Sequence, residues 1–543
     1  MVTINFESQT KRLIDNLKGI CANYGLGNDG NEFKIITQVF LYKFLNDKFA
    51  YEVKKLDPKL AEAEKWEEAI AAYDEGDYEL LTLQLGADTA VLKPEHFISY
   101  LYNRQNESDF AKLFDDTLRD IAITNNEIFS VKTDGGSKIK LFDELSQFIT
   151  DASKRDNFCK ALINQLTEFS FEGIFNQKYD FYAIIFEYLI KDYNKDGGGK
   201  YAEYYTPHAV AKIMAAILVT EEVQDATCYD PSAGSGTLLM NIAHAIGEDR
   251  CTIYSQDISQ KSSSLLRLNL ILNNLVHSIQ NIIQGNTILE PYHKDENGNL
   301  MKFDYIVSNP PFKLDFSDFR DDLDTTENHE RFFAGIPNIP KKKKDSMAIY
   351  QLFLQHIIYS LADNGKAAVV VPTGFITAQT GIDKKIRQHL VENRMLAGVV
   401  SMPSNIFATT GTNVSILFID KSNKKDVVLI DASNLGKKIK EGKNQKTVLS
   451  EEEEKLIIET FNEKKEVEDL SVVVSYDDIA RKNYSFSAGQ YFDVKIEYVD
   501  ITPEEFEERL GSYKMELQEL FKKSKDLEEN IFSSLEKISH AKI

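Results

Sequence analysis

Between about residues 171 and 420, short runs rich in β-branched and aromatic residues alternate with longer helical segments. This alternation indicates an α/β domain with a mainly parallel sheet, because parallel strands need crossover connections that are usually helices. ATCYD, CTIYSQD and FDYIVSN are predicted strands, and TLLMNIAHAIG and SLLRLNLILNNL are predicted helices between them. In such a sheet, ligands bind at the carboxyl ends of the strands.

The chain has 543 residues, too many for one ordinary core, so we expect more than one domain. Residues 1–170 are predicted to form an N-terminal helical domain, since Phe33, Ile36, Phe40 and Phe44 recur at helical spacing. Residues 171–480 form the α/β domain, and residues 481–543 a C-terminal tail with a long amphipathic helix.

Composition narrows the possible environments and partners. The sequence contains no run of about 18 apolar residues, so we expect no membrane span. The N-terminus MVTINFESQTKRL lacks the apolar core of a secretory signal. Cys21, Cys159, Cys228 and Cys251 form no CxxC pair, which argues against a disulfide framework or a metal site and fits a cytoplasmic protein. The net charge of −22 disfavours strong non-specific binding to nucleic acid, unless a partner or a local basic patch provides the contacts to phosphate groups.

The stretch TCYDPSAGSGTLL contains a glycine-containing turn between a predicted strand and a predicted helix. The strand ends at Asp230, and Gly234 and Gly236 allow the backbone to approach a ligand closely. A phosphate often binds at such a turn, but Asp230 would repel it and suits a cationic amino group instead. Taken alone, the turn fits a plain strand-to-helix connection equally well.

A second acid, Asp257, ends the next predicted strand, 21 residues beyond Gly236. At about this spacing an acid binds ribose hydroxyls in nucleotide-binding βαβ units. Asp257 alone reads as a solvated strand end. Together with Asp230 it predicts an adenosine ligand that has an amino-acid tail and no phosphate, and S-adenosylmethionine fits that description.

The run DYIVSNPPF ends a later strand with an amide, two prolines and an aromatic ring. Prolines end sheet pairing, so a simple bend is one interpretation. The sheet order, however, places Asn309 at the same edge as Asp230. The Asn309 side-chain oxygen and the Pro310 carbonyl can accept hydrogen bonds from an amino group, while Phe312 stacks on a flat base. The tetrad therefore favours methyl transfer to an amine, in which alignment matters more than a strong base.

As a set, these motifs resemble those of N6-adenine DNA methyltransferases, most closely the modification subunit of type I restriction-modification systems. The order is the same: a Tyr-Thr-Pro element in GGGKYAEYYTPHAVAKIM (197–214), then the D-x-x-x-G-x-G loop, then Asn-Pro-Pro-Phe. Glu203 replaces the family's usual Gln. The resemblance covers roughly residues 5–500 and implies a Rossmann-like, S-adenosylmethionine-dependent methyltransferase domain in an adenine-specific DNA methyltransferase.

The resemblance also implies site residues. The catalytic tetrad would be Asn309, Pro310, Pro311 and Phe312. The methionine part of the cofactor would lie at the 230–236 loop, the ribose at the following acid, and the adenine near the Asn-Thr pair. The implied cofactor residues are Glu203, Tyr204, Tyr205, Thr206, Pro207, His208, Asp230, Ser232, Ala233, Gly234, Gly236, Asp257, Asn286 and Thr287. His208 is equally compatible with a structural role, and no metal ligands are expected.

The resemblance implies these partners: DNA with a flipped adenine, a specificity subunit, a restriction subunit, and two modification subunits per specificity subunit.

The C-terminal segment begins with the helix start Thr502-Pro503-Glu504-Glu505. An apolar a/d seam follows, formed by Leu510, Tyr513, Leu517, Leu520, Leu527, Ile531 and Ile538. This helix either packs on its own domain or docks on partner helices.

Other functions remain compatible with the residues. Asn-Pro-Pro-Phe recognises an amino group on a flat system, so cytosine N4, an RNA base or a protein glutamine are alternative substrates. A non-catalytic assembly subunit is a further alternative, against which the intact tetrad and glycine loop argue. Lys341–Lys344 lie in a predicted loop that either contacts DNA phosphates or is simply solvated.

Overall fold

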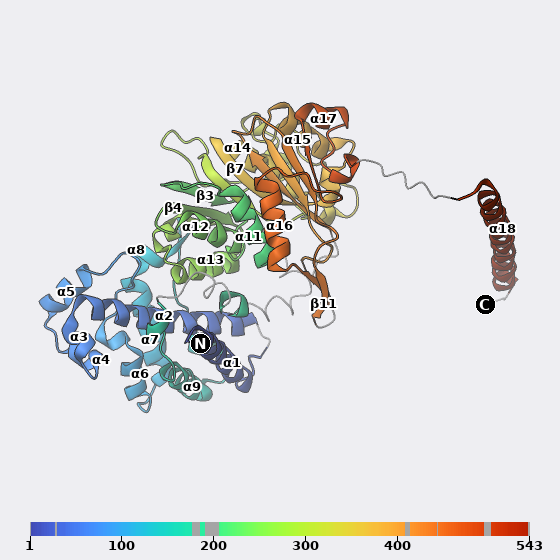
Figure 1. Cartoon of the computed structure of the whole chain (residues 1–543). Coiled ribbons are helices and arrows are strands. Elements are labelled where there is room, and N and C mark those ends of the chain that lie inside the picture. Colours follow the sequence, from blue (N-terminus) through green and yellow to red (C-terminus); the bar gives the residue numbers. More distant parts are fainter. Residues whose placement is uncertain are drawn as a thin grey trace. The chain divides into compact units, whose positions relative to one another are not determined.

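The computed structural model of the chain (Figure 1) describes residues 2–27, 30–175, 185–189, 206–407, 413–441, 444–492 and 501–540. It divides into two units, Met1–Tyr491 and Phe492–Ile543. Across these described ranges, no helix combines the length and apolarity needed to span a membrane.

Helices dominate the N-terminal part of the first unit, as the sequence predicts. Helix α2 (Gly30–Leu56) is the central one, because Phe40, Phe44 and Phe49 are all buried although they lie on different sides of it. Helices α1 (Val2–Asn23) and α7 (Phe110–Thr124) both pack against α9 (Arg155–Thr167). The shorter helices are α3 (Pro58–Glu62), α4 (Trp66–Ala71), α5 (Glu75–Leu83), α6 (Ile98–Arg104) and α8 (Asn126–Phe129).

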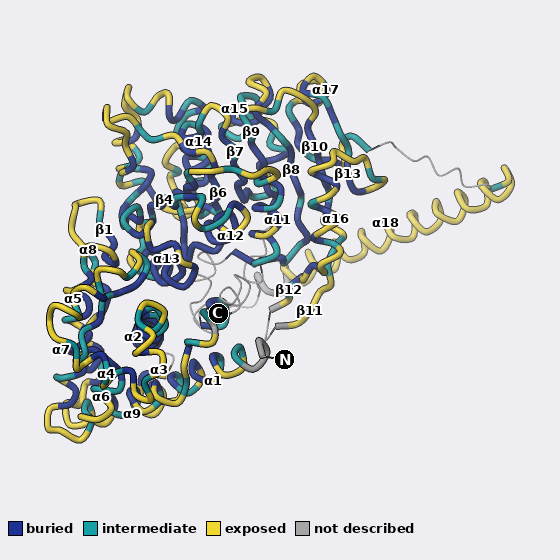
Figure 2. The backbone as a smooth tube through the Cα atoms, turned by 60° about the vertical axis from the view of Figure 1, so that its left-hand side comes forward, coloured by how far each residue is buried: buried dark blue, intermediate teal, exposed yellow. Residues whose placement is uncertain are grey.

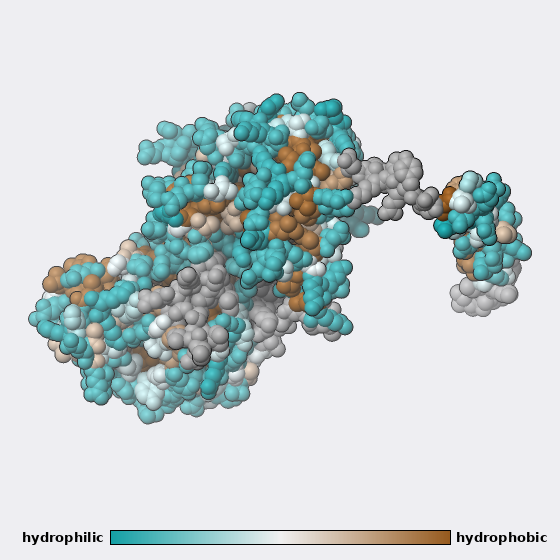
Figure 3. All heavy atoms as spheres, in the orientation of Figure 1, coloured by the Kyte–Doolittle hydropathy of each residue, from teal (hydrophilic) through white to brown (hydrophobic). Residues whose placement is uncertain are grey.

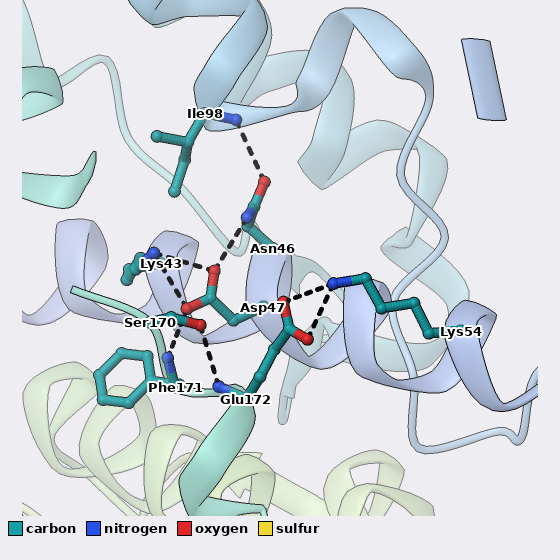
Figure 4. A network of polar contacts seen from close by, with 8 residues as sticks. All are labelled: Lys43, Asn46, Asp47, Lys54, Ile98, Ser170, Phe171 and Glu172. Atoms are coloured by element: carbon teal, nitrogen blue, oxygen red, sulfur yellow. Dashed lines mark hydrogen bonds and ion pairs between the residues drawn. The ribbon is translucent and has the colours of Figure 1, made fainter. Parts of the chain in front are cut away.

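A buried polar network ties α2 to its surroundings (Figure 4). Lys43 and Asp47 form an ion pair one helical turn apart, 2.9 Å between Nζ and Oδ2. Asp47 also accepts hydrogen bonds from the backbone N–H of Phe171 (2.7 Å) and from Asn46, whose side-chain oxygen accepts the N–H of Ile98. Burial raises the pKa of Asp47, although the charge of Lys43 and the hydrogen bonds from Phe171 and Asn46 act in the opposite direction. The network thus joins three separate segments of the chain through the side chains of Asp47 and Asn46.

The predicted sheet is present, and eleven strands of it are described, in the order β13-β10-β8-β9-β7-β6-β3-β4-β5-β1-β2. All run parallel to β3 except β2, β9 and β13, which are antiparallel to their neighbours. The strands are β1 (Val131–Thr133), β2 (Lys138–Ile139), β3 (Ala226–Asp230), β4 (Cys251–Asp257), β5 (Ile282–Gln284), β6 (Phe303–Ser308), β7 (Leu361–Pro372), β8 (Leu396–Ser401), β9 (Val414–Asp420), β10 (Val427–Asp431) and β13 (Ser471–Val474). A separate hairpin contains β11 (Lys437–Glu441) and β12 (Asn444–Val448).

Two groups of helices cover the sheet (Figure 1). One group consists of α11 (His208–Leu218), α12 (Thr237–Ile246), α13 (Gln260–Leu272) and α16 (Glu451–Asn462). The other consists of α14 (Tyr350–Ser360), α15 (Gly381–Glu392) and α17 (Tyr476–Arg481). Strands between them, such as β6, are buried on both faces, which explains their continuous apolar runs.

Two strands come from the segment for which the sequence predicts helices. β1 pairs with β5 in parallel and β2 pairs with β1. The buried guanidinium of Arg267, on α13, donates to the backbone carbonyls of Ile139 (3.1 Å) and Lys140 (3.0 Å). The N-terminal segment and the α/β domain therefore share one sheet.

The strand order reverses direction between β3 and β6. From β3 the chain adds β4 and β5 on one side, whereas β6 and β7 lie on the other. At such a switch point the two connections diverge, and a crevice opens at the carboxyl edge of the sheet. Asp230 ends β3 and Asn309 follows β6, so the two predicted motifs meet at this crevice.

The second unit contains the helix α18 (Pro503–His540). It starts as predicted: Thr502 Oγ1 accepts the N–H of Glu505, and Glu505 Oε2 accepts the N–H of Thr502, both at 3.2 Å. Every residue from 502 to 535 is exposed (Figure 2). Leu517 and Leu520 of the apolar seam are 53% and 54% exposed, and hydrophobic residues lie on the helix surface among hydrophilic ones (Figure 3).

Candidate active site

A small pocket opens where the carboxyl ends of β3 and β6 meet. It brings together residues from all three motifs that the sequence singled out. Its lining consists of Thr206, Asp230, Ser232, Ala233, Gly234, Ser235, Thr237, Leu238 and Asn309. Residues more than a hundred positions apart in sequence therefore face one cavity.

Two short hydrogen bonds hold the start of the glycine-containing loop. Asp230 Oδ1 accepts the backbone N–H of Ser232 at 2.9 Å, and the hydroxyls of Ser232 and Ser308 share a hydrogen bond of 2.7 Å across the switch point. Gly236 has a φ of +84°, and a Cβ there would lie 2.3 Å from Cδ1 of Leu266 on α13. Only glycine fits this position, which lets α12 begin directly beneath the pocket.

Asp230 is an unusual carboxyl group because it is buried and close to a second acid. Burial raises its pKa to about 7, and the charge of Asp257 acts in the same direction, against the hydrogen bonds from Ser232 and Ser308. The described donors to this carboxylate are neutral groups. A cation placed in the pocket would therefore stabilise the ionised form strongly.

Asp257 bridges the loop to the next strand connection. Its Oδ2 accepts the backbone N–H of Gly234 at 3.0 Å, and its Oδ1 accepts that of Ser259 at 2.8 Å. Burial raises its pKa as well. The carboxylate is thus fixed beside the loop, although it does not itself line the small pocket.

The Asn286–Thr287 pair forms a tight turn after β5. Asn286 Oδ1 accepts the backbone N–H groups of Ile288 (3.1 Å) and Leu289 (3.2 Å), and the Thr287 hydroxyl donates to the carbonyl of Pro231 at 2.7 Å. The turn is therefore attached to the glycine-containing loop, on the Asp257 side of the pocket.

Arg331 holds the same turn from the opposite side, and the sequence did not predict this. Its two terminal nitrogens donate to the carbonyls of Thr287 and Ile288, both at 2.8 Å, and its Nε donates to His356 Nδ1 at 3.0 Å. Because Nδ1 accepts, the proton of the neutral ring lies on Nε2, which donates to the Tyr229 hydroxyl at 3.1 Å. Burial and the charge of Arg331 lower the pKa of His356, which keeps the ring neutral.

The Asn-Pro-Pro-Phe tetrad follows β6 directly. Asn309 Nδ2 donates to the hydroxyl of Thr206 at 3.3 Å, which leaves the amide oxygen for another donor. Pro310 is buried, whereas Pro311 and Phe312 are half-buried. The Phe312 ring meets the edge of Tyr350 with centroids 6.1 Å apart, and Tyr350 donates its hydroxyl to Asp383 at 2.8 Å. The ring that we expect to stack on a base is thus supported from behind.

Some predicted residues lie elsewhere or outside the described part. Glu203, Tyr204 and Tyr205 fall outside the described residues, whereas Thr206 and Pro207 are buried and His208 begins α11. Lys341–Lys344 are exposed and lie in a loop apart from one short 3₁₀ turn, as predicted; their contact with DNA stays a prediction.

Two contacts were missed for identifiable reasons. Ser308 looked like the last residue of a strand, and only the adjacency of β3 and β6 brings its hydroxyl to Ser232. Arg331 lies in a polar stretch, RDDLDTTENHERFF, where an arginine is ordinarily solvated. Its neighbours Phe332 and Phe333 were the available signal that this stretch turns inward.

Comparisons with known proteins agree with this geometry. Residues 177–498 match the family model described as N-6 DNA Methylase. The methylase subunit of the type I restriction enzyme MpnII from Mycoplasma pneumoniae is 26% identical over 551 residues, which cover 97% of this chain and 94% of that protein. The MjaIX methylase subunit from Methanocaldococcus jannaschii is 29% identical over 388 residues, covering 68% of this chain and 65% of that one.

A solved structure shows the same fold. It is the methyltransferase subunit of a type I restriction-modification system from Streptococcus thermophilus, with a TM-score of 0.71 and 23% identity over 90% of this chain and 100% of that one. The family match covers more than half of the 543 residues. The chain therefore belongs to the N-6 DNA methylase family, whose reaction is methylation of adenine N6 in DNA.

Proposed function

We propose that this chain is the methyltransferase subunit of a type I restriction-modification complex and takes its methyl group from S-adenosylmethionine. The observation that carries the proposal is the meeting of Asp230 and Asn309 in one pocket at the switch point of the sheet. One end of this pocket suits a cationic amino-acid group, and the other suits a planar amine.

The residues present fit S-adenosylmethionine. The described hydrogen-bond donors to the buried carboxyl of Asp230 are neutral, and its pKa is raised. An ammonium group beside it would stabilise the carboxylate. The positive φ of Gly236 leaves the loop backbone close to the pocket. Asp257 would hold ribose hydroxyls, and the Asn286–Thr287 turn would border the adenine. When bound, the cofactor supplies an electrophilic methyl group on a sulfonium.

The tetrad orients the accepting amine. Thr206 accepts from the Asn309 amide nitrogen and so fixes which way the amide faces, leaving Oδ1 to accept from the adenine N6 amino group. The Pro310 carbonyl would accept the second N6 hydrogen. With both hydrogens directed, the nitrogen lone pair is aligned for attack, which is the main requirement of such a displacement. Phe312 would stack on the base, and Tyr350 keeps that ring in place.

The partners follow from the family and from what this chain leaves exposed. We propose that DNA presents a flipped adenine, that a specificity subunit reads the sequence, and that two copies of this chain join one specificity subunit, with a restriction subunit added. The exposed seam of α18, including Leu517 and Leu520, is the surface that we assign to helices of the specificity subunit.

The experiment is to express the chain with the products of its neighbouring genes in a host without adenine methylation and to map N6-methyladenine in the genome. We expect methylation at one defined sequence, and none when Asn309 is replaced by Ala. Another methylated product in place of N6-methyladenine, or no methylated product, would contradict the proposal.

A further inference from the structure

The β11–β12 hairpin gathers positive charge in a strongly acidic chain. Residues 437–446 read KKIKEGKNQK, with five lysines and one glutamate, whereas the whole chain carries −22. Lys437, Lys438 and Lys440 are exposed. The register places Lys438 opposite Thr447 and Lys440 opposite Gln445, so these two lysines share one face and Lys437 lies on the other.

The hairpin leaves the same edge of the sheet as the active site. It follows β10, which runs parallel to β8 and, through the alternation with β9, parallel to β3 and β6. The end of β10 at Asp431 therefore lies at the carboxyl edge, where Asp230 and Asn309 meet. Figure 1 shows β11 extending away from the sheet.

Three hydrogen bonds fix the base of the hairpin. Thr447 donates its hydroxyl to the carbonyl of Ser404 (2.6 Å) and its N–H to that of Asn405 (3.0 Å), in the loop after β8. Gly436 donates its N–H to Glu453 on α16 at 2.7 Å. An isolated two-stranded hairpin is barely stable, so these anchors hold the projecting strands in position.

The anchoring helix also leads back to the pocket. Glu454 of α16 forms an ion pair with Lys212 of α11 at 3.0 Å, and the two helices pack together. The start of α11 follows directly on Pro207, and the preceding residue, Thr206, lines the pocket. Of the four glutamates at the start of α16, Glu453 and Glu454 are engaged in these contacts, and only Glu451 and Glu452 are exposed.

We propose that the β11–β12 hairpin is an arm that contacts the phosphate backbone of duplex DNA beside the active site. Exposed lysines on a rigidly rooted ribbon at the catalytic edge match a polyanion, which the rest of this acidic chain repels. A two-stranded ribbon also has the dimensions of the major groove. The inference rests on the proposed function, since it assumes that the substrate is DNA.

The test uses the complex that co-purifies with this chain and a short fluorescent duplex of mixed sequence. The variant is Lys437→Gln/Lys438→Gln/Lys440→Gln. The control, Lys59→Gln/Lys112→Gln/Lys154→Gln, removes the same charge from exposed lysines of the N-terminal helical region. Duplex affinity is measured by anisotropy across a salt series, together with S-adenosylmethionine binding and the unfolding temperature.

We expect the slope of log affinity against log salt to become shallower by about 2 to 3 in the hairpin variant, since each lost phosphate contact removes about 0.9. Cofactor binding, unfolding temperature and the slope of the control should stay at wild-type values. A hairpin slope equal to that of the wild type, or equal losses in both triple variants, overturns the inference. If instead the wild-type complex methylates no adenine, the proposed function itself fails.

Discussion

The carboxyl edge of the sheet and helix α18 differ in how many of their side chains find contacts within the chain. At the edge, side chains from distant segments hold one another: Ser232 meets Ser308, and Arg331 spans to Thr287. In the part of α18 whose side chains the structure describes, the apolar seam is exposed, with Leu517 and Leu520 more than half exposed. The first region is organised by its own fold, whereas the second presents a surface suited to a partner. The predictions below test this contrast.

The largest effect is expected at Asn309. Replacing it with Ala removes the oxygen that accepts from the amine, and methyl transfer should fall by about 10²- to 10³-fold, while cofactor affinity changes little. Asn309→Asp replaces the amide with a carboxylate, which still offers an acceptor oxygen, and should retain more activity than the Ala variant. Transfer of a radioactive methyl group to DNA measures the rate, and calorimetry measures cofactor binding. Full activity of Asn309→Ala would refute the role of this residue.

The next effect concerns assembly. Leu517→Asp/Leu520→Asp should weaken association with the specificity subunit by about 10²-fold or more, since each buried anchor contributes about 2 kcal/mol or more. The isolated chain should keep its unfolding temperature, because both side chains are already exposed. The matched control is Met515→Asp/Gln518→Asp, which adds the same two negative charges at exposed positions on the side of the helix away from the seam. Equal loss of co-purification in both variants would remove the seam from consideration.

Asp230 predicts a pH dependence of cofactor binding. Its pKa of about 7 reflects burial of the unliganded carboxyl, whereas a bound ammonium favours the carboxylate. Binding therefore releases a proton, and affinity should fall as pH drops below about 7, by up to about tenfold per unit. The folded chain without cofactor should lose stability as pH rises from about 4 to about 7, because the folded form binds this proton more tightly than the unfolded form.

Asp230→Asn separates this group from other titrations. The variant should bind S-adenosylmethionine more weakly at pH 8 than the wild type does and should show a flatter pH profile. Calorimetry between pH 5.5 and 8 provides the measurement. An unchanged profile in the variant would assign the dependence to another residue.

Arg331→Lys should give the smallest effect. Lysine keeps the charge but cannot bond both carbonyls and His356 at once, and each unsatisfied carbonyl costs about 1–3 kcal/mol. The KM for S-adenosylmethionine should rise several-fold with little change in kcat, because the turn borders the proposed cofactor site rather than the amine. A lower unfolding temperature with an unchanged KM would limit Arg331 to a structural role.

Sequence reasoning worked best where the signal is local. The Thr502 helix start, the strand ending at Asp230, and the bend after Ser308 all depend on neighbouring residues, and the structure contains each of them. It failed at β1 and β2, which contain three and two residues and so are too short for a periodic pattern. β1 becomes a strand by pairing with β5, more than a hundred residues later in the chain, and β2 in turn pairs with β1.

In the candidate site, too, some features follow from the sequence and others depend on the fold. Asp230, Gly236 and Asn309 could be named from spacing alone, because strand order places such residues at one edge. The amide orientation of Asn309, set by Thr206, and the clamp of Arg331 on the Asn286–Thr287 turn could not, since they depend on side chains that meet only after folding.

By itself, the sequence determined the α/β class, the chemistry at the strand ends and the apolar seam of α18, because residue type and spacing express these directly. Tertiary structure alone decided that the N-terminal segment adds strands to the sheet, that a buried arginine holds the Asn286–Thr287 turn, and that a lysine-rich hairpin leaves the carboxyl edge of the sheet. The physical reason is that hydrogen bonds and ion pairs between distant segments produce no recognisable residue pattern in either segment.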